Sequence, residues 1–115
     1  MQMIDKKQFM DNFQYFDNEV ILEIINIFID EYPERMETLK KNIADKDFDQ
    51  LKFNAHSLKG VVANFVAPEV QELARQLELK GAHKDLTDAE KIYRELKEKA
   101  DIVVEELNEL KKNFE

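Results

Sequence analysis

Apolar side chains recur every three or four residues along most of this 115-residue chain. That spacing places them on one face of an α-helix and differs from the strict alternation of a half-buried strand. The chain has only two glycines and two prolines, which is too little turn chemistry for a many-stranded sheet. The sequence therefore predicts an all-α protein.

The N-terminal part of the sequence predicts a short helix and a long one. The short helix covers Lys6 to Phe13, and the long helix begins near Asn18, a suitable capping residue. The long helix carries a continuous apolar stripe, formed by Ile21, Ile24, Ile25, Phe28, Tyr32, Met36, Leu39 and Ile43. Pro33 lies inside this helix and is expected to bend or break it, because proline removes a backbone donor.

Three further helices are predicted after a turn near residue 46. Asp47 is a good N-cap for the third, whose stripe comprises Phe48, Leu51, Ala55, Leu58, Val62 and Phe65. The fourth starts at Pro68 and is expected to end at Gly81. Thr87 or Asp88 is expected to cap the last, whose stripe comprises Ala89, Ile92, Leu96, Ala100, Val103, Leu107, Leu110 and Phe114. Short connections favour an up-and-down antiparallel four-helix bundle with a short N-terminal cap helix.

Size, charge and composition narrow the classes of function. A chain of 115 residues has room for one compact domain, so residues 1–115 are interpreted as a single domain. The formal charge of −8 disfavours nucleic acid or an anionic membrane as partner. The chain has no cysteine, no membrane-spanning apolar run and no signal-peptide pattern at its N-terminus. A cytoplasmic location is the resulting expectation.

The third predicted helix carries the candidate site. His56 lies about 130° around the helix from the apolar stripe and is therefore expected to be exposed. Lys52, Lys59, Gly60 and Ala63 share its face. Residues 46–64 have a formal charge of +1, whereas the remainder of the chain has −9.

Gly60 is unusual because a glycine inside a helix costs roughly 1 kcal/mol relative to alanine. Two explanations are open. The missing side chain would let a partner or a phosphoryl group approach His56, or it would permit tight helix packing. The helical wheel points Gly60 away from the apolar stripe, which favours the first explanation.

The residue types on this face suit phosphoryl transfer. An exposed imidazole is largely uncharged at pH 7, so a ring nitrogen can attack phosphorus without a separate base. Lys59, with Lys52 as a second candidate, can partly neutralise the phosphoryl charge. Phe53 points outward near His56, where it would either anchor a partner or be buried under a neighbouring segment.

Other residues carry weaker signals. His83 is expected to be an ordinary surface residue in a polar loop, and no spacing of ligands indicates a metal or cofactor site. Nothing in the sequence could bind ATP, which argues against an autonomous kinase. Four apolar residues beside the stripe of the second helix are expected to be buried under the N-terminal helix rather than to form a docking surface: Val20, Leu22, Ile27 and Ile29.

The string HSLKG at residues 56–60 resembles the H-[ST]-L-K-G signature of histidine-containing phosphotransfer domains. The resemblance extends in order over Phe28, Tyr32-Pro33 and Leu39, Leu51 and Ala55, Ala67-Pro68, and Leu77-Glu78. It implies that His56 accepts a phosphoryl group, that Lys59 steadies the group, and that Gly60 leaves access open.

The resemblance also implies a phosphocarrier rather than an enzyme. The expected partners are response-regulator receiver domains, which would supply the aspartate, an acidic pocket and Mg²⁺. A hybrid sensor histidine kinase is a further candidate. The face formed by Lys52, Phe53 and Ala63 is expected to contact the partner.

The sequence departs from the family pattern in two regions. Val61-Val62 and Val66 stand where the family has small residues and then a glycine. The turn before the fourth helix is therefore expected to differ from that of the family. Glu78 stands where several relatives have glutamine, and a carboxylate there would repel phosphohistidine unless it points elsewhere; no role is assigned to it. The alternative function is a helical-bundle interaction module that binds receivers without phosphotransfer.

Overall fold

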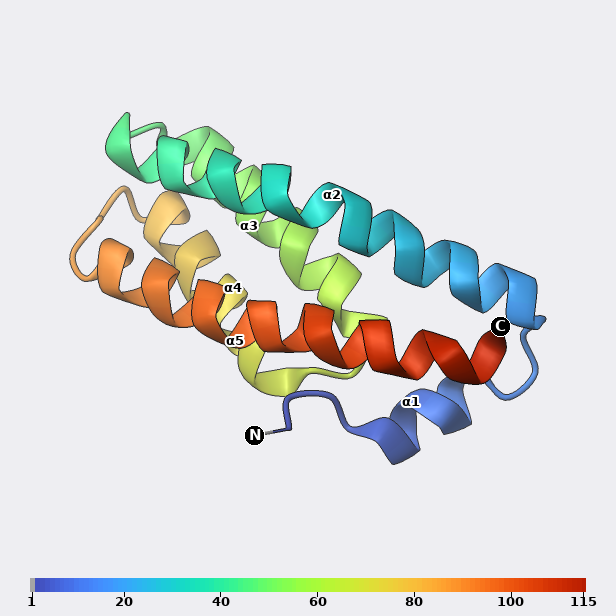
Figure 1. The fold of residues 1–115 in the computed structure, drawn as a ribbon. Helices are drawn as coiled ribbons and strands as arrows, with labels where there is room; N and C mark the ends of the chain where they lie inside the picture. Colours follow the sequence, from blue (N-terminus) through green and yellow to red (C-terminus); the bar gives the residue numbers. More distant parts are fainter. Residues whose placement is uncertain (1) are drawn as a thin grey trace.

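The computed structural model describes residues 2–115, and within this range it contains helices and no strand (Figure 1). Its elements are α1 (Lys6–Phe13), α2 (Asn18–Ala44), α3 (Phe48–Ala63), α4 (Pro68–Ala82), α5 (Ala89–Leu110) and a terminal 3₁₀ turn (Lys111–Phe114). The helices α2 to α5 form an up-and-down bundle, and α1 lies across one end of it, near the C-terminus (Figure 1). The predicted fold class is confirmed.

One hydrophobic core lies between the four long helices. Each contributes side chains that are essentially inaccessible to solvent, among them Ile25, Phe28, Leu51, Leu58, Leu77, Leu96 and Leu107. The cap helix joins this core through Phe9, whose ring lies 6.3 Å from those of Phe65 and Phe114. None of the helices in residues 2–115 combines the length and apolar character needed to cross a membrane.

Of the two outcomes predicted for Pro33, a break does not occur, and a bend stays a prediction. Helix α2 runs without interruption from Asn18 to Ala44, and Figure 1 shows it as one ribbon. Tyr32 and Met36, on either side of the proline, are both buried. Packing of this continuous apolar stripe stabilises the helix against the loss of one backbone hydrogen bond.

The expected N-cap residues are in place at α3 and α5, but only the cap of α3 makes a side-chain hydrogen bond. The side chain of Asp47 accepts a hydrogen bond from the backbone N–H of Gln50 at 3.2 Å. At the start of α5, Asp88 has a left-handed backbone, with φ of 62°, and makes no side-chain cap bond. Thr87 instead donates its hydroxyl to Asp85 at 2.7 Å.

The inward-facing stripe of α5 differs from the predicted one at one position, since Tyr93 is buried and Ile92 is only partly buried.

Gly81 does not end α4 through a turn. It lies inside the helix, its φ is not positive, and the helix continues to Ala82. A Cβ atom added at Gly81 would lie 2.6 Å from the backbone nitrogen of Lys52 and 2.7 Å from the carbonyl oxygen of Phe48. Gly81 therefore allows the backbones of α3 and α4 to approach closely.

The turn before α4 has the geometry expected of a glycine although valine occupies it. Val66 has φ of 56°, a left-handed conformation that is unfavourable for a β-branched residue. Its carbonyl oxygen accepts a hydrogen bond from the backbone N–H of Asp5 at 2.8 Å. The departure of Val66 from the family pattern thus leaves the turn in place, and the segment before α1 holds it.

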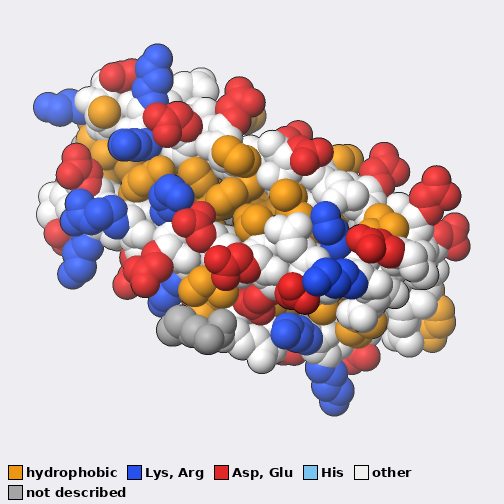
Figure 2. All heavy atoms as spheres, in the orientation of Figure 1, with side chains coloured by type: hydrophobic (Ala, Val, Ile, Leu, Met, Phe, Trp, Pro, Cys, Tyr) orange, Lys and Arg blue, Asp and Glu red, His pale blue; other side chains and the backbone are white. Residues whose placement is uncertain are grey.

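Apolar side chains also reach the surface. Figure 2 shows them along the line between α2 and α5, with acidic and basic side chains on both sides. The predicted burial of Val20 and Ile27 under α1 is wrong, since both are exposed, whereas Leu22 and Ile29 are partly buried against the core. The reason is that α1 packs its phenylalanines toward Phe65 and Phe114 instead of covering this part of α2.

Candidate functional site

Helix α3 presents His56 to solvent. The His56 side chain is 66% exposed, while Ala55 and Leu58 beside it are completely buried. The 3.6-residue period explains this contrast, because the apolar stripe turns toward α2, α4 and α5 and leaves His56 on the opposite side. The predicted exposure is confirmed.

Gly60 lies one turn after His56 in open space. Apart from its chain neighbours and the adjacent backbone of its own helix, no atom lies within 4 Å of the place where a Cβ atom would be. Tight helix packing therefore does not explain this glycine. Unobstructed access to the imidazole stays the predicted explanation.

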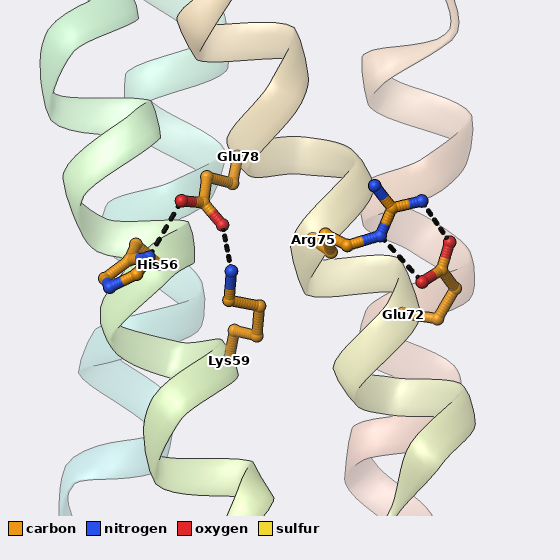
Figure 3. A network of polar contacts seen from close by, with 5 residues as sticks. All are labelled: His56, Lys59, Glu72, Arg75 and Glu78. Atoms are coloured by element: carbon orange, nitrogen blue, oxygen red, sulfur yellow. Dashed lines mark hydrogen bonds and ion pairs between the residues drawn. The ribbon is translucent and has the colours of Figure 1, made fainter.

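Glu78, on α4, connects His56 and Lys59 (Figure 3). Its Oε2 lies 2.8 Å from Nδ1 of His56, and its Oε1 accepts a hydrogen bond from Nζ of Lys59 at 2.6 Å. The carboxylate, to which the sequence assigned no role, thus points toward His56. Lys59 compensates its charge, and the close α3–α4 packing at Gly81, about one helical turn away, brings it within reach of α3.

The surroundings keep Glu78 ionised. Partial burial raises the pKa of the Glu78 carboxyl, but hydrogen bonds from Lys59 and His56 outweigh that effect and leave the pKa below its usual value. The Glu78 side chain is only 16% exposed and that of Lys59 27%. Both are therefore shielded from solvent more than a typical surface ion pair.

This contact determines which ring nitrogen is available. An ionised carboxylate can only accept hydrogen bonds, so Nδ1 of His56 must carry the proton that faces Glu78. In a neutral ring the lone pair then lies on Nε2. Figure 3 shows this second nitrogen pointing away from Glu78. The site presents an oriented nucleophile to solvent without a catalytic base.

The predicted partner-binding residues lie around the histidine. An open hollow of about 490 Å³ is lined by Asp49, Lys52, Phe53, His56 and Glu78. Phe53 is 67% exposed, so its burial under a neighbouring segment is excluded. Ala63 is also exposed, at the end of α3.

A second unpredicted contact lies behind the histidine. Arg35 of α2 donates from Nη1 to the Ser57 hydroxyl at 2.9 Å and pairs with Glu31 at 3.2 Å. Ser57 follows His56 directly, so this bond ties the helix turn that carries His56 to α2. Sequence spacing offered no signal for it, because Arg35 and Ser57 are 22 positions apart.

The second histidine of the chain does not take part in this arrangement. His83 is exposed in the turn after α4 and lines a separate hollow between α4 and α5. Among residues 2–115, no three His, Cys, Asp or Glu side chains are grouped so that they could hold a metal ion.

An antiparallel four-helix bundle with one oriented, solvent-facing histidine defines a class of small phosphocarrier modules. The sequence matches the Hpt domain family over residues 23–112, and the chain belongs to this family. Its function is therefore histidine phosphotransfer in two-component signalling, as a carrier rather than a catalyst. Domains of this family interact with receiver domains and kinases.

The structure is also similar to a solved one, the histidine-containing phosphotransfer protein B (HptB) of Pseudomonas aeruginosa PAO1. The TM-score is 0.89, and the match covers 98% of this chain and 97% of the other at 18% sequence identity. The two proteins share the fold. A comparison with curated proteins gave no match.

Proposed function

We propose that His56 accepts a phosphoryl group from the aspartyl phosphate of one receiver domain and passes it to the aspartate of another. The observation that supports this assignment is the exposed ring whose Nδ1 is engaged by Glu78 at 2.8 Å. The free nitrogen, Nε2, points away from Glu78 (Figure 3), and Gly60 leaves open space one helical turn after His56.

The transfer step needs little from this protein. The Nε2 lone pair forms a bond to phosphorus, and the P–O bond to the donor aspartate breaks, with its electron pair remaining on the carboxylate. The receiver would supply the acidic pocket and the Mg²⁺ that neutralise charge at phosphorus. Lys59 contributes positive charge one turn from the ring, and its ammonium group balances Glu78 at 2.6 Å.

The docking surface would be the outward face of α3 around Lys52, Phe53 and Ala63. Phe53 offers an exposed aromatic anchor. Residues 46–64 carry a formal charge of +1 in a chain of −8, which is complementary to an acidic receiver pocket. A hybrid sensor kinase would meet this face through its own receiver domain.

The assignment is tested by mixing this protein with a receiver domain that carries radiolabelled aspartyl phosphate. Acid-labile label should appear on the wild-type protein and on His83→Gln, and should be absent from His56→Gln. Equal labelling of His56→Gln would refute the role of His56. Receiver binding without transfer, unaffected by this substitution, would support the interaction module instead.

Two further expectations belong to this proposal. Residues 1–115 would act as a single phosphotransfer module, of which Met1 lies outside the described residues. The cytoplasmic location expected from the cysteine-free composition stays a prediction.

A further inference from the structure

The Glu78 carboxylate can make its observed contact with His56 only when the ring nitrogen that faces it carries a proton. A carboxylate has acceptor oxygens and no donor. If Nδ1 lost its proton, its lone pair would face Oε2 at 2.8 Å, and two electron-rich atoms would repel each other. Lys59 holds the other carboxylate oxygen at 2.6 Å, which limits rotation of Glu78 away from the ring.

This constraint matters most after phosphorylation. A histidine that carries a phosphoryl group on Nε2 has two forms, one with a proton on Nδ1 and a cationic ring, the other with a bare Nδ1 lone pair. The first form donates a charge-assisted hydrogen bond from Nδ1 to Glu78. In the second form Nδ1 has no proton to donate, so it makes no hydrogen bond with the carboxylate. Glu78 therefore favours the protonated form of the phosphorylated ring.

We propose that Glu78 keeps a proton on Nδ1 of His56 throughout the transfer cycle, so that the phosphoryl group always leaves from a protonated ring. The proposal rests on His56 being the phosphoryl acceptor. On arrival, the Nε2–P bond forms and the Nδ1 proton stays in place. On departure, an oxygen of the acceptor attacks phosphorus, and the electron pair of the N–P bond returns to Nε2.

The protonated ring is the better leaving group. It departs as neutral imidazole, whereas an unprotonated ring would have to depart as an imidazolate anion. Glu78 would thus make the phosphorylated state more reactive toward its acceptor and shorter-lived in water. This makes Glu78 a positioning residue that acts through the His56 ring.

Few other charged groups face the ring. From α3 these are Asp49 and Lys52, which line the hollow beside His56, and Lys59, which is bound to Glu78. From α4, Glu78 is the group in contact. Arg75 of α4 is engaged by Glu72 at 2.6 Å (Figure 3). Glu78 is therefore the negative charge best placed to retain the Nδ1 proton.

The informative variant is Glu78→Gln. Glutamine has nearly the same shape, but its amide can accept from a protonated Nδ1 or donate to an unprotonated one. It therefore fits both forms of the ring and removes the preference for a protonated Nδ1. The matched control is Glu72→Gln, which neutralises an exposed carboxylate of α4 that pairs with Arg75 instead of His56.

The three proteins are phosphorylated with phosphoramidate, and the ³¹P resonance of phosphohistidine is followed by NMR from about pH 5 to about pH 9. The pH midpoint of the shift should be about one unit or more lower in Glu78→Gln than in wild type and in Glu72→Gln. Equal midpoints in the wild type and Glu78→Gln would overturn the proposal.

Hydrolysis of the phosphohistidine gives a second readout in the same samples. At a pH well above both midpoints, the wild type should lose phosphate roughly tenfold faster than Glu78→Gln, because midpoints one unit apart then give protonated fractions that differ about tenfold. At the acidic end both rings are protonated and the rates should converge. A constant ratio at every pH would indicate a structural effect and overturn the proposal. Absence of phosphohistidine in the wild type would refute the proposed function as well.

Discussion

The two glycines of this chain lie in opposite environments. Gly60 of α3 is exposed, and apart from its chain neighbours and the adjacent backbone of its own helix, no atom lies within 4 Å of a prospective Cβ. Gly81 of α4 is buried, and a Cβ there would lie 2.6 Å from the backbone of Lys52. Both lie inside helices, where glycine costs roughly 1 kcal/mol relative to alanine.

The difference shows how α3 combines two tasks. Its inward side needs close contact with α4, which Gly81 permits, and this contact brings Glu78 to His56. On its outward side, Gly60 leaves open space one helical turn after His56. The same residue type thus occupies a place where two helix backbones approach closely and a place that is open to solvent.

The largest effect on stability is expected for Gly81→Ala. Helix propensity alone would favour alanine, but the added methyl group would press on the backbone of Phe48 and Lys52, which cannot move as a side chain tip can. We expect the free energy of unfolding to fall by about 3 kcal/mol, measured by urea denaturation. An unchanged or higher midpoint would contradict the close approach of α3 and α4.

A smaller effect of opposite sign is expected for Gly60→Ala. The methyl group meets no neighbour, so the gain in helix propensity should raise the free energy of unfolding by about 1 kcal/mol. The companion variant Gly60→Gln should be similarly stable and transfer phosphate more slowly, because its longer side chain crowds the imidazole. Unchanged transfer by Gly60→Gln would show that access does not depend on this glycine.

The smallest effect on stability is expected for Phe53→Ala. Its side chain is 67% exposed, so the free energy of unfolding should change by less than about 0.5 kcal/mol. If Phe53 anchors a receiver, the dissociation constant should increase about tenfold, as for a moderate interface anchor, measured by calorimetry. Lys112→Ala, at the far end of the chain, is the control and should bind as the wild type does.

Much of this protein could be predicted because helix periodicity is local. The stripes and turn residues predicted the helices and their order, and the outward position of His56 and Gly60 followed from the helical wheel. The wrong predictions concern places where packing of the core overrides a local sequence rule. Pro33 does not break α2, because the apolar stripe continues on both sides and is buried.

The sequence by itself determined the bundle, the position of the histidine and the open space beside it. The tertiary structure alone decided that Glu78 faces His56 and Lys59, that Arg35 holds Ser57, and that Gly81 serves packing. The physical reason is that the direction of a side chain on one helix depends only on spacing within that helix. What it meets depends on the separation and rotation of the neighbouring helix, which the packing of the whole core determines.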